Sequence, residues 1–224
     1  MRTVALAVLL SLAPLVGAQE NLGMYYQNLY FSTHVRFGAG GHGGGRRARR
    51  PHYAPRFNPT PRRSGAIERM VARVPATSRA DVRRRLTALQ GKFPQVMREA
   101  GQQLGTTLHP GDVRDVASVA GVAAFQELRG VTLTNAQFRN ELRGTYDNFK
   151  TDTATPAQYQ QAGETYEMAI LLMSVLKQES RRPGGAQAAG WLRGLAQETL
   201  LKAYSTKDAT TLRVGTKGIE RSHK

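Results

Sequence analysis

The sequence predicts an all-α protein: a single compact bundle of about five to six helices, preceded by a disordered basic segment rich in glycine, arginine and proline, and followed by a short extended C-terminal tail or hairpin. Three observations support this fold class. Helix start and stop residues recur along residues 67–224, and the apolar residues between them repeat at helical spacing. No run of alternating apolar and polar residues extends beyond a few positions, which argues against a large sheet.

The first three predicted helices are marked by caps, prolines and a terminal glycine. Ser78, followed three residues later by an aspartate, predicts a helix start. Pro94 predicts the beginning of the next helix or a kink in it, and Gly105 predicts its end. Pro110 and Asp112 introduce a third helix.

The later helices have stronger start signals. Residues 134–137 (TNAQ) can form a capping box, and residues 155–158 (TPAQ) combine a cap, a proline in the first turn and a glutamine that can reach back. After residues 183–185 (PGG), a final helix is predicted. Only residues 212–214 (LRV) resemble a strand.

Two helix surfaces are predicted to be buried. From Met168 to Leu176 the helix is apolar on nearly every side, so we expect it to be the central and most buried helix. Ala117, Gly121 and Ala124 form a stripe of small residues, which predicts that two helices approach closely there.

Residues 1–18 have the three parts of a cleavable secretory signal peptide. Met1–Thr3 is positively charged, Val4–Gly17 is apolar, and Val16–Ala18 supplies small residues for cleavage. The apolar run is shorter than the ~20 residues that span a bilayer, and Pro14 interrupts it. We therefore expect an exported protein, periplasmic or extracellular, with no transmembrane segment in the mature chain. The chain has no cysteine, which excludes disulfides, a lipoprotein anchor and cysteine-ligated metals.

Charge and composition divide the mature chain into two regions. Residues 19–66 hold eight arginines and one acidic residue, a net charge of +7, whereas the helical domain at residues 67–224 holds 23 basic and 15 acidic residues, a net charge of +8. Residues 37–64 are predicted to be disordered, because their glycines, prolines and like charges leave little apolar surface to bury. Residues 25–37 are aromatic and lack helix breakers, which is compatible with a short strand or a docked segment.

The basic segment contains the candidate binding residues. Guanidinium groups at this density, with aromatic residues following, suit anionic polymers. A simple solvated linker is the alternative interpretation, since charge runs on flexible segments are usually just hydrated. The candidate polyanion-binding residues are Arg46, Arg47, Arg49 and Arg50.

No catalytic, cofactor-binding or metal-binding residue is predicted. Glu164 and Glu167 are spaced i, i+3, but a paired-carboxylate metal site in a bundle also needs Glu-x-x-His motifs, which the chain lacks. We expect Glu167 to lie at a helix edge and to pair with an arginine. The histidines have no ligand spacing, and His109 is expected to cap a helix beside Pro110. Nucleophile-elbow, phosphate-loop and dinucleotide motifs are also missing.

The order of elements resembles a family of uncharacterised exported bacterial helical domains, a family of unknown function. The similarity lies in residues 157–179, with ETYEMAILLM at 164–173, then LRGLA at 192–196 and LRVGTKGI at 212–219. It covers roughly residues 67–220. The resemblance implies a helical fold and export, and it implies no activity.

These observations favour an exported, non-enzymatic protein whose helical domain binds a partner and whose cationic segment adheres to anionic envelope or extracellular polymers, or to another envelope protein. Two alternatives stay open: an enzyme acting on cell-wall or extracellular polymers through Glu164 or Glu167, and a protein that binds extracellular nucleic acid. The enzyme alternative would require the carboxylates of Glu164 and Glu167 to face a pocket. Sequence-specific nucleic-acid recognition is not favoured, because a charge run on a flexible segment is usually just solvated.

We predict that the mature protein begins at Gln19, because the small residues of the cleavage site follow an apolar run too short to remain as an anchor. Intact-mass measurement or N-terminal sequencing of exported material would check this. Retention of residues 1–18 in membrane fractions would contradict it.

Overall fold

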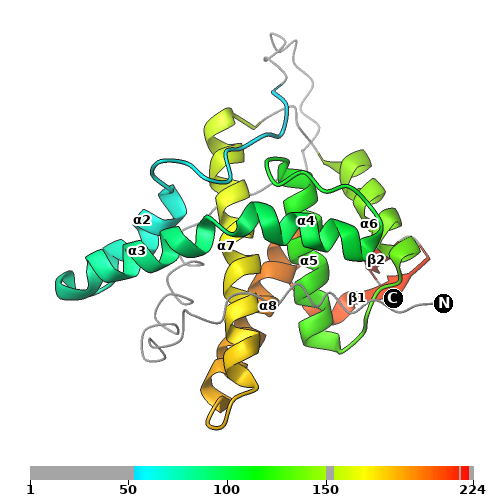
Figure 1. The fold of residues 1–224 in the computed structure, drawn as a ribbon. Helices are drawn as coiled ribbons and strands as arrows, with labels where there is room; N and C mark the ends of the chain where they lie inside the picture. The colour runs from blue at the N-terminus through cyan, green and yellow to red at the C-terminus, as the bar shows by residue number, and fades with distance from the viewer. Residues whose placement is uncertain (1–52, 150–153, 217, 222–224) are drawn as a thin grey trace.

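The computed structural model describes residues 53–149, 154–216 and 218–221 and confirms the helical fold class (Figure 1). The predicted signal peptide, residues 25–37 and the four candidate arginines at positions 46, 47, 49 and 50 lie outside the described residues. The helices are α2 (Gly65–Ala72), α3 (Arg79–Gln90), α4 (Phe93–Leu104), α5 (Val113–Arg129), α6 (Asn135–Asn148), α7 (Pro156–Ser180) and α8 (Ala186–Ala203). A hairpin of β1 (Leu212–Gly215) and β2 (Gly218–Arg221) follows α8 and a short 3-10 turn.

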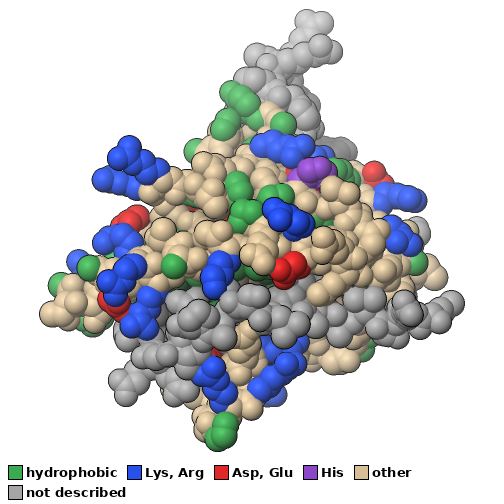
Figure 2. All heavy atoms as spheres, in the orientation of Figure 1, with side chains coloured by type: hydrophobic (Ala, Val, Ile, Leu, Met, Phe, Trp, Pro, Cys, Tyr) green, Lys and Arg blue, Asp and Glu red, His purple; other side chains and the backbone are tan. Residues whose placement is uncertain are grey.

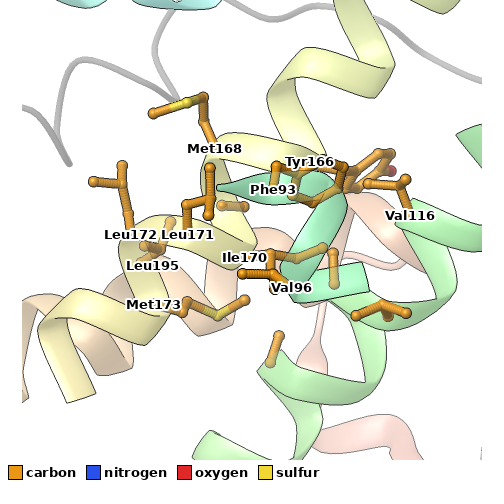
Figure 3. Close-up of a cluster of buried hydrophobic side chains, with 14 of the residues drawn as sticks. Phe93, Val96, Val116, Tyr166, Met168, Ile170, Leu171, Leu172, Met173 and Leu195 are labelled. Atoms are coloured by element: carbon orange, nitrogen blue, oxygen red, sulfur yellow. The ribbon is translucent and has the colours of Figure 1, made fainter. Parts of the chain in front are cut away.

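Helix α7 forms the centre of the bundle, as its apolar sequence predicts. It packs against α5 and α8 on one side and against α2 and α3 on the other (Figure 1). Every residue from Ala162 to Met173 is buried, which removes a large apolar area from water. Figure 3 shows the middle of this core, where Leu171 and Leu172 of α7 lie near Leu195 of α8.

Local sequence signals account for most helix starts. The capping boxes at Thr134 and Thr155 are both formed, and the Asp112 side chain accepts a hydrogen bond from the Arg114 N–H at the start of α5. Gly105 ends α4 with φ of +62°, in the left-handed region that glycine adopts without steric cost. Helix α3 begins after Ser78 as predicted, but the Ser78 side chain makes no capping hydrogen bond.

Residues 54–64, which we call the strap, pack on the domain and correct the prediction of disorder for this part of residues 37–64. The Phe57 N–H donates to the Gly111 carbonyl, and the Val113 N–H donates to the Pro55 carbonyl. The ring of Phe57 is 8% exposed and lies against Gly163 of α7. The Phe57 ring packed against Gly163, together with these backbone hydrogen bonds, holds the strap on the domain although its composition favours disorder. The strap leads into α2, so the packed domain begins before the predicted boundary at residue 67.

At Gly121, in the predicted stripe of small residues, α5 closely approaches the C-terminal end of α8. A Cβ atom at Gly121 would lie 3.0 Å from the Tyr204 ring and 3.3 Å from the Ala203 Cβ atom. The prediction of a close helix approach is therefore confirmed at this position. Helices α5 and α8 have the most extensive contact between any two elements of the described structure.

The C-terminal hairpin is antiparallel, and a buried carboxylate of α6 contributes to its attachment to the bundle. Glu141 of α6 accepts hydrogen bonds from the Ile219 N–H of β2 at 2.7 Å and from the Tyr204 hydroxyl at 2.8 Å. Burial raises the pKa of Glu141, and these two donors oppose the shift. Among the described residues, no helix is long and apolar enough to cross a membrane.

The contact between Phe57 and Gly163 can be tested with a double-mutant cycle. A Cβ atom at Gly163 would lie 2.3 Å from the Phe57 ring, so Gly163→Ala should displace the strap and reduce the free energy of unfolding by about 1–3 kcal/mol. In a Phe57→Ala background, the same change should be neutral or stabilising by up to ~1 kcal/mol, because alanine favours a helix over glycine. Urea unfolding of the four proteins gives the coupling energy. Equal effects of Gly163→Ala in both backgrounds would contradict the packing described.

Candidate anion-binding site

The arginine-rich part of the chain continues from the basic segment into the folded domain. Residues 36–85 contain fourteen arginines and two acidic residues, so they contribute +12 to a net charge of +16. The described part of this stretch, residues 53–85, forms the strap, α2 and α3. Figure 2 shows Lys and Arg side chains gathered over α2 and α3, at the left of the view. The high charge density therefore does not end where the helical domain begins.

A cleft of about 570 Å³ lies within this cationic region, between the end of the strap, α2 and α3. Its rim carries Arg62, Arg63 and Arg83, and its single acidic lining residue is Glu68. Ser64 and Gln90 line it as buried polar residues, 4% and 3% exposed.

Glu68 and Arg83 neutralise one another across the cleft. The Arg83 guanidinium donates two hydrogen bonds of 2.8 Å to the Glu68 carboxylate, and this holds the pKa of Glu68 below its ordinary value. Both side chains are 46% exposed, so the pair contributes little to stability. Arg62 and Arg63 are exposed and make no hydrogen bond or ion pair with another residue in the described part of the chain. These two guanidinium groups give the cleft its excess positive charge.

Glu164 is a structural residue that joins α7 to the start of α2. Its Oε2 atom accepts a 2.8 Å hydrogen bond from the Ala66 N–H, and its Oε1 atom accepts from the Gln160 side chain. A carboxylate at this point satisfies a helix N–H group that has no partner within α2 and complements the positive end of the helix dipole. The Gln160 side chain also exchanges hydrogen bonds with the backbone of Asn58 in the strap.

Glu167 does not lie at a helix edge and does not pair with an arginine, which corrects the sequence prediction. Its side chain is fully buried, and its Oε2 atom accepts a hydrogen bond from the Gln90 side chain at 3.3 Å. Burial raises the pKa of Glu167 to about 9, so its carboxyl group is protonated at neutral pH. The prediction failed because α7 is apolar on nearly every side, so this helix has no solvated edge at that position. Neither Glu164 nor Glu167 lines the cleft between the strap, α2 and α3.

His109 does not cap a helix; Asp112 takes that role in α5. The backbone N–H of His109 donates to Asp115 Oδ2 at 2.7 Å, and the ring Nδ1 of His109 lies 3.2 Å from the same oxygen. The Tyr146 hydroxyl donates to the other oxygen of Asp115, which is 1% exposed. The Arg114 guanidinium stacks 3.9 Å from the centre of the Tyr146 ring. This cluster connects the loop before α5 to α6.

An Asp–His pair can serve as a general base toward water or a substrate group, and it activates a protein nucleophile only when that group lies within hydrogen-bond reach. In the part of the chain that the structure describes, the His109 ring forms a hydrogen bond with Asp115 and none with a protein hydroxyl group. Over the same residues, no three His, Asp or Glu side chains are grouped so that they could hold a metal ion.

The chain matches no protein-family model, no curated protein and no solved structure. The resemblance to exported helical domains stays a prediction, and the function is inferred from the residues themselves.

Sequence reasoning missed the folded part of the arginine-rich region because it divided the chain at residue 67. The available signal was the run of Arg83, Arg84 and Arg85 in α3, which extends the arginine density past that boundary. Two of these arginines pair with Asp81 on the same helix. The cleft itself depends on a contact between α3 and a segment some twenty residues earlier, which no local pattern in the sequence specifies.

The raised pKa of Glu167 predicts a specific pH dependence of stability. In the unfolded chain this carboxyl ionises near 4.5, whereas in the fold it keeps its proton up to about pH 9. Between these values the folded state binds more protons than the unfolded state, so the free energy of unfolding falls as pH rises.

Glu167→Gln removes this titration and keeps an acceptor for Gln90. We expect the variant to unfold like the wild type near pH 4 and to become more stable than it as pH approaches 9, by on the order of a few kcal/mol. Urea unfolding at several pH values measures the difference. A difference that does not change between pH 4 and pH 9 would contradict the prediction.

Proposed function

We propose that this chain is an exported, non-enzymatic protein that binds anionic polymers through the arginine-rich residues 36–85, with the helical domain serving as the scaffold that presents them and contacts a partner. The observation that carries the proposal is the continuity of charge: nine arginines and two acidic residues occur in residues 53–85 alone. Those residues form an ordered surface, and the four candidate arginines of the basic segment precede them in the sequence.

Electrostatic attraction supports binding that depends on charge and not on sequence. Guanidinium groups that neutralise phosphates, sulfates or carboxylates release bound counterions, and this release favours association at low salt. An ordered cationic face that is joined through the chain to the basic segment also offers two linked contact regions to one long polymer, which increases the effective concentration of the second contact. Teichoic-acid-like polymers, heparin and DNA should therefore compete comparably.

The alternative of an enzyme finds limited support in the Asp115–His109 pair. Its imidazole is 57% exposed, as a general base that meets substrate would require. Neither Glu164 nor Glu167 supports that alternative, since both are buried in structural hydrogen bonds.

We expect binding to heparin or DNA to weaken steeply as salt rises, with a log–log slope of about 0.7–0.9 per phosphate neutralised in the case of DNA. Replacing the four arginines of the basic segment by glutamine should weaken binding at low salt by at least about tenfold. Replacing them by lysine should retain most of the binding, because a diffuse site recognises charge. A salt titration of binding by fluorescence anisotropy gives both quantities.

A charge-matched control removes four exposed arginines outside the arginine-rich region. If the position of the arginines matters, this control should bind heparin and DNA more tightly than the variant with glutamines in the basic segment, although the two variants carry the same net charge. No binding at low salt, or tight binding to a single polymer that survives high salt, would overturn the proposal. The control positions are Arg98, Arg139, Arg143 and Arg193, each changed to glutamine.

A further inference from the structure

We propose that the cleft between the strap, α2 and α3 is a discrete binding site for one tetrahedral oxyanion, a phosphate or sulfate group carried on a larger molecule. The inference rests on the proposed function, because it assigns a particular group of an anionic polymer to a particular place. It adds selectivity to a surface that otherwise recognises only charge.

The charge of the cleft favours a single anionic group. Its lining holds three arginines and one glutamate, a net charge of +2. The glutamate is satisfied by Arg83, so its negative charge is compensated within the cleft. Arg62 and Arg63 remain exposed at the rim, and adjacent guanidinium groups can each donate two hydrogen bonds to the oxygens of a phosphate or sulfate.

The floor of the cleft adds neutral hydrogen-bond donors. Ser64 Oγ accepts from the Ile67 N–H, which leaves its hydroxyl proton available to a ligand. Gln90 Nε2 carries two hydrogens, and one Glu167 oxygen accepts one of them. Both side chains are more than nine-tenths buried, so their positions are fixed by packing before a ligand arrives. Donors at the floor and cations at the rim surround an oxyanion from several directions, which suits a tetrahedral group better than a planar carboxylate.

Two nearby carboxyl groups do not oppose an anion in this cleft. Glu167 lies behind Gln90 and is protonated at neutral pH, so the floor is not negatively charged. Glu164 accepts a hydrogen bond from the Ala66 N–H at the start of α2, and the neighbouring Arg69 guanidinium compensates its charge. The attraction therefore comes from arginine side chains and not from an unoccupied helix terminus.

The size of the cleft indicates that the oxyanion belongs to a larger ligand. A volume of about 570 Å³ falls in the range of small-molecule sites and exceeds what a single phosphate fills. A sugar phosphate, a sulfated sugar unit or a nucleotide within a chain would fill it. The proposed occupant is thus one repeat unit of a phosphorylated or sulfated polymer.

The test measures binding of inorganic phosphate, sulfate and acetate to the chain from Gln19 onward, by NMR titration or calorimetry at constant ionic strength. We expect phosphate and sulfate to bind at one site and acetate to bind at least several-fold more weakly. Arg62→Gln combined with Arg63→Gln should weaken phosphate binding tenfold or more. Since both side chains are exposed, this variant should keep the wild-type melting temperature.

The matched control is Arg98→Gln combined with Arg193→Gln, which removes the same charge from exposed positions on α4 and α8. It should leave phosphate binding within about twofold of the wild type. Equal weakening by both double variants would show diffuse charge only and overturn the site, and so would equal affinity for acetate and phosphate.

The two proposals fail separately. If heparin and DNA do not bind but phosphate still binds in an Arg62- and Arg63-dependent manner, the polymer function falls and the cleft stands. If polymers bind with a steep salt dependence but inorganic phosphate does not bind, the cleft proposal falls and the diffuse surface stands. Glutamine at positions 46, 47, 49 and 50 should reduce polymer binding while leaving phosphate binding unchanged.

Discussion

The hydrogen bond between the Glu164 carboxylate and the Ala66 N–H joins the central helix α7 to the beginning of α2, and the cationic surface depends on it. Helix α2 is only eight residues long and has little stability of its own. Its position is fixed by this bond, by the Ser64 cap and by burial of Ile67, Met70 and neighbouring side chains against the core. The cleft exists because α2 holds Arg62 and Arg63 opposite α3. Glu164, which only the enzyme alternative considered as a functional carboxylate, is therefore a structural support of the candidate binding site.

Interactions between residues close in sequence were predictable, and interactions between distant residues were not. The capping boxes at Thr134 and Thr155 join residues three positions apart, so the sequence contains both partners in one window. Glu164 and Ala66 are 98 positions apart, and no periodicity indicates that they meet. Phe57 was assigned to a disordered segment because composition averages over residues and gives no weight to a single ring that fits against Gly163. Glu167 was misplaced because a helix that is apolar all round gives no information about which face a lone polar residue occupies.

The distribution of charge also explains how a strongly basic chain tolerates its own repulsion. Several arginines of residues 53–85 are paired: Arg83 with Glu68, and Arg84 and Arg85 with Asp81. Arg79 donates to the carbonyls of Ala72 and Val74, which closes the turn between α2 and α3. Those arginines serve local structure, while Arg62 and Arg63 do not. The division between structural and available guanidinium groups is what gives the cationic face one preferred position for a ligand.

The attachment of the strap has a mechanical consequence for a protein held by its basic segment. Tension on a bound polymer would enter the domain at residue 53 and load the strap first. Its backbone hydrogen bonds to Gly111 and Val113, its hydrogen bonds with Gln160 of α7 and the Phe57 ring against Gly163 would carry that load first. Breaking these contacts would release about ten residues of the strap, which span roughly 35 Å when fully extended, and would leave the helical core folded. The strap would then detach and extend under load before the helices unfold, and so limit the force that an anchored polymer transmits to the folded domain.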